Sequence, residues 1–322
     1  MKSELPATTE LSAEQHKKKS GALYAIGAYF MWGLFPLYWI PLNRVPAIEI
    51  LAHRILWALV FMISLLWVSG KWSTFLKQLK ELFHNLRNLF LVFAAALLIS
   101  LNWFIYIWAV TNNHVVESSM GYYINPLVSI VLGILILKEK LTIPQVVAVV
   151  LAACGVLVQT VAFGQLPLIA LTLAFSFGFY GLTKKLIKID PSIELTFETL
   201  FVTPVALFYL VHVQISGTAA FANGSLLTTL LLIGTGVVTA VPLLFFAEGA
   251  QRISLTMIGF FQYITPTLSL LIGITVYKEA FTLVQLISFS FIWLALLVFS
   301  LSGLNFKKRV TSEGRAAQSG HQ

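Results

Sequence analysis

The side chains of this chain that are best suited to bind a ligand are polar groups that interrupt long apolar runs. Glu49, His53 and Arg54 open one such run; Glu49 and His53 lie one helical turn apart and Arg54 lies on their flank. Ionisable groups inside a membrane-spanning helix are costly and usually face a protein interior or water. This favours a cavity-facing, functional role for Arg54, with interfacial snorkelling as the alternative, and an interfacial position for Glu49.

Two further runs place aromatic and amide groups near mid-span. Trp32 stands beside Gly33 and one turn before Pro36, so cavity lining and helix packing are both open for it. Trp39, near the end of the same run, is expected at the membrane interface. The other run contains Asn102, Trp103 and Tyr106, with Asn102 and Tyr106 on one helical face. For Asn102, a helix–helix hydrogen bond and ligand contact both remain open.

The strongest pattern is a repeat of one polar stripe. At a constant separation of 140 residues, nine positions are identical between residues 121–145 and 261–285: Tyr123/Tyr263, Ile124/Ile264, Pro126/Pro266, Ser129/Ser269, Gly133/Gly273, Lys138/Lys278, Glu139/Glu279, Thr142/Thr282 and Gln145/Gln285. Within each copy a helix would present polar groups on one face: Tyr122, Asn125 and Ser129 in the first, Gln262, Thr265 and Ser269 in the second. The chain is therefore expected to consist of two related halves.

Prolines inside these runs predict irregular helices. Pro36, Pro126, Pro242 and Pro266 each remove a backbone donor and crowd the preceding turn, so we expect a kink at each of the four. The carbonyl groups freed in this way need a partner from protein, water or ligand. We expect the Tyr122 and Gln262 ends of the two stripes to line a cavity, and the glycine ends to pack closely.

Composition places the chain in a membrane. Apolar residues make up 58% of it and charged residues only 11%, which leaves too few charges to cover a soluble surface. With about 20 apolar residues needed per crossing, we expect ten spans. They run over 22–42, 47–69, 89–111, 116–137, 143–162, 166–184, 194–214, 226–250, 254–277 and 282–304. The predicted fold is all-α and integral to the membrane.

The net charge of +8 is explained by topology, with no need for a nucleic-acid partner. If both ends are cytoplasmic, all of the 21 basic residues except Arg44, Arg54 and Lys278 fall on the cytoplasmic side. Five spans in each half make the two copies cross the membrane in opposite senses. The halves therefore form an inverted repeat, with a binding site expected near mid-membrane between them.

Known catalytic and metal-binding patterns are missing from the sequence. It has no P-loop, no G-x-S-x-G, no H-x-x-x-H pair, a single cysteine and a single aspartate, Asp190. We therefore expect no enzyme activity, no cofactor and no metal. Glu194 and Glu198 lie near a group of lysines, where a cytoplasmic ion-pair cluster is favoured over a transport role.

These strings resemble the EamA-type drug/metabolite transporter superfamily, and within it the RarD branch. They are G-x-x-x-x-W-G-x-x-P at 27–36, E-I-L-A-H-R at 49–54, N-W at 102–103 with Tyr106, G-Y-Y-I-N-P-L at 121–127 and G-F-F-Q-Y-I-x-P at 259–266. The resemblance implies ten transmembrane helices in two inverted five-helix EamA repeats around a central cavity. It also implies location in the inner membrane and export of small organic molecules.

Together these observations predict a multi-pass secondary transporter, an exporter of small organic metabolites or drugs that works by alternating access. A membrane-embedded enzyme acting on a lipid-linked substrate is the alternative. We expect cytoplasmic tails at 1–20, disordered, and at 307–322, with repeats at 21–163 and 164–306. The expected cavity residues are Trp32, Arg54, Asn102, Trp103, Tyr106, Tyr122, Asn125, Gln262 and Thr265. The expected partners are an organic substrate, the lipid bilayer and a coupling proton or sodium ion.

Overall fold

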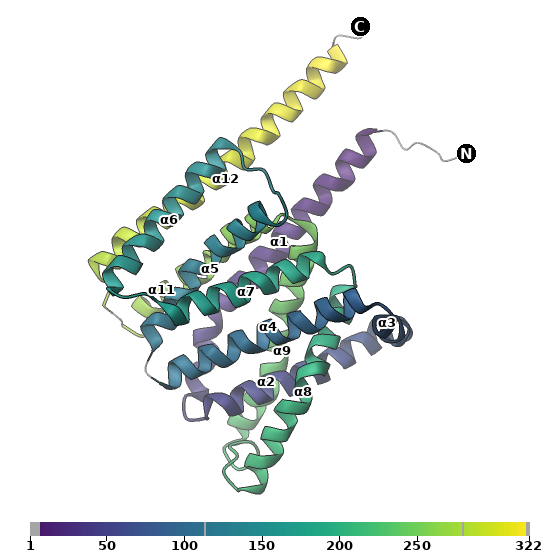
Figure 1. Cartoon of the computed structure of the whole chain (residues 1–322), viewed down its shortest axis with the longest axis vertical. Coiled ribbons are helices and arrows are strands. Elements are labelled where there is room, and N and C mark those ends of the chain that lie inside the picture. The colour runs from purple at the N-terminus through teal and green to yellow at the C-terminus, as the bar shows by residue number, and fades with distance from the viewer. Residues whose placement is uncertain (1–6, 113, 279, 320–322) are drawn as a thin grey trace.

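The computed structural model describes residues 7–112, 114–278 and 280–319, and every regular element in this part of the chain is helical (Figure 1). The α-helices are α1 (Ala7–Trp39), α2 (Ala47–Val68), α3 (Trp72–His84), α4 (Leu86–Thr111), α5 (Val115–Leu135), α6 (Ile143–Phe163), α7 (Leu168–Leu186), α8 (Pro191–Ile215), α9 (Leu226–Arg252), α10 (Leu255–Gln262), α11 (Ile264–Thr275) and α12 (Leu283–Ser319). A short 3-10 turn, Ile40–Leu42, follows α1.

Nine helical stretches of the described chain are long and apolar enough to cross a membrane, the last-but-one being α10 and α11 taken together. They coincide with nine of the ten expected spans. The expected sixth span is also a helix, α7, but it is not among the nine, because Lys184 and Lys185 in its last turn lower its mean hydropathy. The protein is therefore an all-helical, multi-pass membrane protein.

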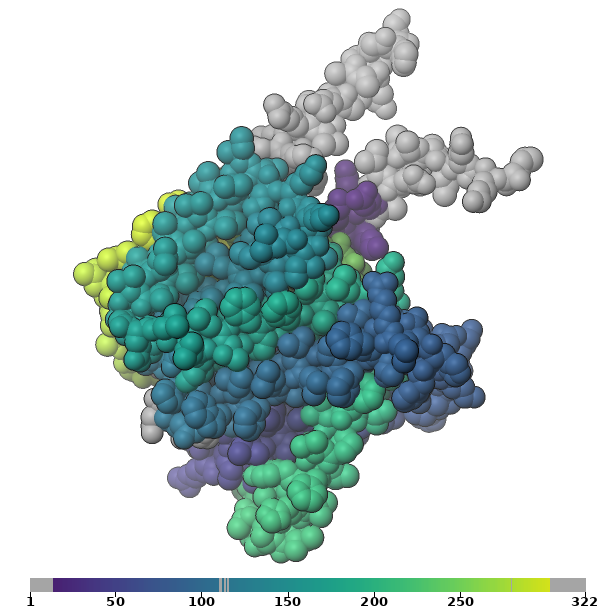
Figure 2. Space-filling view, viewed as in Figure 1, coloured from purple at the N-terminus to yellow at the C-terminus, as the bar shows by residue number. Residues whose placement is uncertain are grey.

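The outer surface of the bundle is apolar, as a lipid-facing surface must be. In the space-filling view, α4 (blue) and α6 (teal) form much of one face (Figure 2). The exposed side chains of α4 include Phe90, Leu97 and Phe104, and those of α6 include Ile143 and Val161. A contiguous apolar surface of this extent is typical of contact with lipid and not with water.

Close helix crossings depend on glycine. A Cβ added at Gly236 of α9 would lie 2.3 Å from the backbone carbon of Trp57 in α2. A Cβ at Gly155 of α6 would lie 2.8 Å from the carbonyl oxygen of Ser288 in α12. Without hydrophobic driving force in lipid, helices associate by such close packing of small residues. The α2–α9 and α6–α12 pairs are accordingly among the closely packed pairs of the bundle.

The repeat predicted from sequence is visible in local geometry. Lys138 and Lys278 both adopt the left-handed backbone conformation, with φ of 55° and 57°. Shortly after each, a threonine backbone N–H donates to a glutamine side chain three residues on: Thr142 to Gln145 and Thr282 to Gln285, each at 2.9 Å. Glu279, the counterpart of Glu139, lies outside the described residues. The two segments therefore fold alike around these positions.

The proline-bearing helices differ between the two copies. Pro126 lies within the continuous helix α5, whereas the second copy is divided into α10 and α11 at Tyr263, shortly before Pro266. Pro36 and Pro242 lie inside α1 and α9, which both run on without a break. The kinks expected at these prolines stay a prediction.

Most of the N-terminal tail that was expected to be disordered is helical. Residues 7–20 continue α1, and Lys18 pairs with Glu14 one turn away at 2.7 Å. Residues 1–6 lie outside the described part. The expectation of disorder is wrong for residues 7–20, because Glu, Gln and Lys are good helix formers and the i,i+4 pair adds to this.

Both chain ends lie on one side of the bundle. In Figure 1 the start of α1 and the end of α12 project in the same direction, and α3, seen end-on, crosses the bundle near this side. As expected for an amphipathic segment, α3 buries Phe75 and Leu82 and exposes Lys77 and Lys80. Its position fits a helix that lies at the membrane surface.

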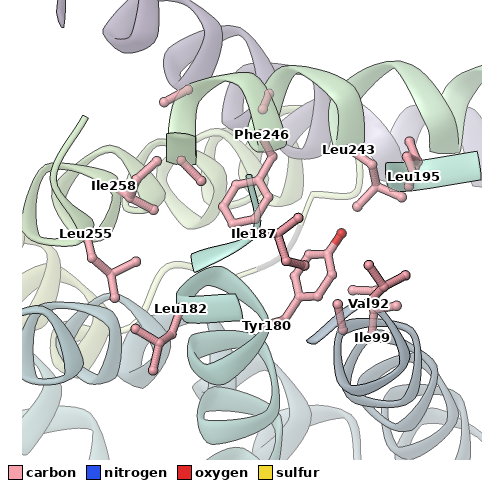
Figure 3. Close-up of a cluster of buried hydrophobic side chains, with 14 of the residues drawn as sticks. Val92, Ile99, Tyr180, Leu182, Ile187, Leu195, Leu243, Phe246, Leu255 and Ile258 are labelled. Atoms are coloured by element: carbon pink, nitrogen blue, oxygen red, sulfur yellow. The ribbon is translucent and has the colours of Figure 1, made fainter. Parts of the chain in front are cut away.

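The densest part of the core surrounds α7. Figure 3 shows Tyr180 of α7 beside Phe246 of α9, with Val92 and Ile99 on α4 close by. The rings of Tyr180 and Phe246 stack with centroids 5.7 Å apart and planes at 13°. This core fills the bundle on one side of the cavity described next.

Candidate functional site

A cavity of about 350 Å³ lies at the centre of the bundle. It is bounded by residues of α1, α2, α4, α5, α7, α9, α10 and α11, so both halves of the chain contribute to it. All nine residues expected from the sequence line it: Trp32, Arg54, Asn102, Trp103, Tyr106, Tyr122, Asn125, Gln262 and Thr265. Pro36 and Pro266 also line it.

Arg54 is the charged residue of this lining. Its guanidinium lies 4.9 Å from the ring centroid of Trp103 and 5.3 Å from that of Trp39. Its Nε donates a hydrogen bond of 3.0 Å to Thr239 Oγ1. No ion pair joins Arg54 to a carboxylate of the described residues within 4.0 Å. The guanidinium is thus held by aromatic faces and one hydroxyl, and its charge is not neutralised by the protein around it.

Two tyrosines face one another across the cavity wall. The rings of Tyr106 (α4) and Tyr122 (α5) meet edge to face with centroids 6.0 Å apart. Tyr106 is 37% exposed and Tyr122 44% exposed, although both lie well inside the bundle. The exposed surface of both rings belongs to the cavity, where it is open to a ligand.

Other members of the lining hold helices together. Asn102 Nδ2 donates to Leu173 O at 2.9 Å and to Ser176 Oγ at 3.0 Å, so the helix–helix bond considered for Asn102 is present. Thr265 Oγ1 donates to Tyr29 O at 2.9 Å. These side chains border the cavity while their polar atoms are engaged with neighbouring helices.

The two polar stripes meet at the interface of the repeats. Ser129 Oγ of α5 donates to Gln262 Oε1 of α10 at 3.1 Å. The hydroxyl of Tyr263 donates to the carbonyl oxygen of its own counterpart, Tyr123, at 3.4 Å. Gln262 and Tyr122, which occupy related places in the two copies, thus differ: Gln262 is buried and bonded, and Tyr122 is open to the cavity.

Two buried polar atoms of the lining have no hydrogen-bond partner within the described chain. They are Asn125 Oδ1 and the hydroxyl of Tyr29, in residues that are 7% and 1% exposed. Buried polar atoms are nearly always paired in native proteins, so unpaired ones call for an explanation such as water or a ligand. The wall of the cavity thus contains two polar groups that the described protein leaves unpaired.

The aromatic lining extends further than expected from the sequence. Trp39 was expected at the membrane interface, but its ring packs against the Arg54 guanidinium and borders the cavity. Trp39 lies two helical turns after Trp32 and therefore on the same face, and its position at the membrane interface stays a prediction. Thr239 and Phe177 also line the cavity, and nothing in the sequence distinguishes them from ordinary packing residues.

Glu49 and His53, which precede Arg54 in α2, are not part of the cavity lining. Glu49 Oε1 accepts hydrogen bonds from the backbone N–H groups of Ala220 (2.8 Å) and Phe221 (3.2 Å). His53 Nδ1 accepts one from Trp57 Nε1 at 3.2 Å, and the His53 ring packs on Phe221. Both are buried and fix the connection between α8 and α9. Within the described residues, no group of three or more His, Cys, Asp or Glu could hold a metal ion.

Comparison with known proteins supports a membrane transporter. The EamA-like transporter family matches the chain twice, over residues 19–161 and 166–301. The uncharacterized transporter YojE of Bacillus subtilis is 49% identical over 298 residues, covering 91% of this chain and 98% of YojE. Protein RarD of Escherichia coli K12 is 44% identical over 293 residues, with 91% and 98% covered.

A solved structure with 15% sequence identity, titled only "Crystal structure of protein", has the same fold. The TM-score is 0.66, and the alignment covers 88% of this chain and 98% of the other. The fold, the two family matches and the similarity to RarD over most of its length agree with one another. The chain is therefore a membrane transporter of the EamA-like transporter family and belongs to its RarD branch.

Proposed function

We propose that this protein is a secondary-active transporter that exports small organic solutes through its central cavity. The observation that carries the proposal is the cavity itself, with its aromatic walls and an un-neutralised arginine. Ligand sites are typically concave and mostly apolar, with a few polar groups that orient the ligand.

The chemistry of the lining defines a solute class. The rings of Trp32, Trp103, Tyr106 and Tyr122 favour a flat organic molecule over an inorganic ion. Arg54 favours a solute that carries a carboxylate or another strong acceptor, because a guanidinium is selective for such groups. A planar organic acid, or a neutral aromatic molecule with a polar substituent, fits both requirements.

The proposed mechanism is alternating access by two inverted repeats. It is supported by the repeated segments, by the hydrogen bonds between the two copies, and by the presence of helix at each of the ten expected spans, one of which is formed by α10 and α11 together. In such folds the site stays near mid-membrane and one half rocks against the other. We place both termini in the cytoplasm and the protein in the inner membrane, on the distribution of Lys and Arg.

The proposal is tested by a solute screen in proteoliposomes, with pH and sodium gradients imposed in turn. We expect accumulation of a planar organic solute against its gradient, and a loss of accumulation in Arg54→Gln. Arg44→Gln is the matched control, because Arg44 is exposed in the connection after α1. Flux that only equilibrates the solute, under every gradient, would show a passive pore instead.

A further inference from the structure

A group of charged side chains lies fully buried where α7 ends and α8 begins. Lys184 Nζ is 3.1 Å from Glu194 Oε1 and 2.7 Å from Glu198 Oε1. Lys184 and Glu194 are 0% exposed and Glu198 is 2% exposed. From the sequence we expected an ion-pair cluster in the cytoplasm. The pairing is present, but the cluster is inside the protein.

The charges of this cluster do not balance if both carboxyls are ionised. Two carboxylates face one ammonium, which leaves one negative charge. Among the described residues, Lys184 is the only cation within 4.0 Å of either carboxyl. An uncompensated charge away from water is too costly to persist, and two buried carboxyls that share a site resolve this by keeping a proton on one of them.

The surroundings supply hydrogen bonds but no second cation. From α7, the Tyr180 hydroxyl donates to Glu198 Oε2 at 3.3 Å. From α9, Gln251 Nε2 donates to Glu194 Oε2 at 3.5 Å. The neighbouring cations are engaged elsewhere: Arg252 with Glu248, Lys71 with Asp190, and Lys185 with the carbonyl oxygen of Ile253. From α4, the core contributes apolar side chains.

The cluster lies between a polar pocket and the floor of the central cavity. Gln251 lines the pocket, which holds about 450 Å³ and also includes Lys17, Lys188 and Asp190. On the other side, Tyr180 packs against Phe177, and Phe177 packs against Trp32, with ring centroids 5.7 and 5.8 Å apart. Phe177 and Trp32 line the central cavity. Two ring contacts thus connect the cluster with the lining of the cavity.

We propose that Lys184, Glu194 and Glu198 form a proton-binding site that holds one exchangeable proton and couples its release to the opening of this end of the bundle. Release breaks the O–H bond of one carboxyl and delivers the proton to water in the polar pocket. The remaining pair of carboxylates on one lysine then needs water, which favours separation of α7 from α8. Sodium is disfavoured as the ligand, because the Lys184 ammonium already lies between the two Oε1 atoms.

The proton itself is tested without any substrate, by infrared spectroscopy of the full-length protein in lipid nanodiscs at neutral pH. We expect the carbonyl stretch of a protonated carboxyl in the wild type and its loss in Glu194→Gln and in Glu198→Gln, since each variant leaves one carboxylate for one lysine. Glu248→Gln is the control, which should keep the band. A wild type without the band, or a band retained in both cluster variants, overturns the proton site.

Folding is checked by the melting temperature of each variant. Gln has the shape of a protonated carboxyl, so we expect at least one of the two variants to melt near the wild-type temperature. If both variants lose the folded state while the control does not, the cluster is structural and the proposal is overturned.

The coupling of proton release to opening rests on the proposed transport function, and it is tested by a separate transport measurement. In proteoliposomes, we expect the cluster variants to lose accumulation driven by a pH gradient and the Glu248→Gln control to keep it. Accumulation that persists in both variants overturns the coupling role and leaves the infrared result standing. If the wild type carries no solute across the membrane, the proposed transport function is overturned, and the infrared result still stands.

Discussion

Removing the charge of Arg54 is expected to weaken solute binding more than it weakens the fold. Arg54→Gln removes a hydrogen bond to Thr239 and contacts with the rings of Trp103, Trp39 and Phe35. Ring contacts contribute about 0.5–1 kcal/mol each and a hydrogen bond to a charged group about 1.5–3 kcal/mol. This loss of stability is offset by about 2.5–3.5 kcal/mol, because the variant no longer has to keep a charged side chain within the membrane.

The net loss in the free energy of unfolding should therefore lie between about −0.5 and 3.5 kcal/mol. An anionic solute that loses its buried charge partner should lose about 2–5 kcal/mol of binding free energy, which raises its Kd about 30- to 4,000-fold. The assay combines the melting temperature in nanodiscs with quenching of tryptophan fluorescence by an aromatic carboxylate and by its neutral amide.

Two further variants separate the contributions of Arg54. Arg54→Lys keeps the charge and loses the planar stacking, so we expect carboxylate binding between that of the wild type and Arg54→Gln. Thr239→Val removes the hydrogen bond alone and should leave the preference for the carboxylate intact. The reasoning is refuted if Arg54→Gln lowers the melting temperature strongly while the affinities for carboxylate and amide stay as in the wild type.

Three other perturbations test the surrounding framework. Single cysteines in place of Lys138 and Lys278 should react with an impermeant reagent from opposite sides of the membrane, and reaction from the same side would exclude inverted repeats. Tyr122→Phe should reduce solute affinity at an unchanged melting temperature, whereas Gln262→Leu, which leaves the Ser129 hydroxyl without its partner, should cost about 1–3 kcal/mol of stability; the reverse order would contradict the assignment. Gly236→Ala should prevent normal assembly in the membrane, since its Cβ would overlap the α2 backbone, and a normal yield of folded protein would refute the tight crossing.

Much of the cavity could be predicted because a membrane makes polar residues conspicuous. In an apolar run, Arg54 or Asn102 stands out at once, and helical spacing shows which neighbours share its face. The nine expected residues come from five separate stretches of the chain, and they converge on one cavity. The repeat of the stripes already indicated that two of these stretches had related positions.

Other features depend on contacts between distant residues and could not be predicted in this way. Whether Gln262 faces a ligand or another helix is decided by Ser129, more than a hundred residues earlier. The burial of Glu194 and Glu198 follows from the way α8 packs against α2, α4 and α9. The sequence predicted an ion-pair cluster on the cytoplasmic side but not its burial, because carboxylates are seldom fully buried unless paired.

The division of the second copy into α10 and α11 at Tyr263 could not be predicted from the sequence either. Pro126 and Pro266 occupy equivalent positions, yet only the helix around the second is divided. A proline removes the same donor in both copies, so the difference must come from the surroundings. In the second copy, Thr265 bonds to α1 and Tyr263 bonds to the first copy.

The claim that one cavity opens alternately to both sides is tested most directly by the reactivity of a cysteine inside it. Ser269→Cys, made together with Cys154→Ser, places a thiol in the lining, and Ser290→Cys on the exposed surface of α12 is the control. We predict fast reaction with an impermeant maleimide from one side at a time, a change of side when the imposed pH gradient is reversed, and protection by a transported solute. Fast reaction from both sides under a single condition, or from one side under all conditions, would contradict alternating access.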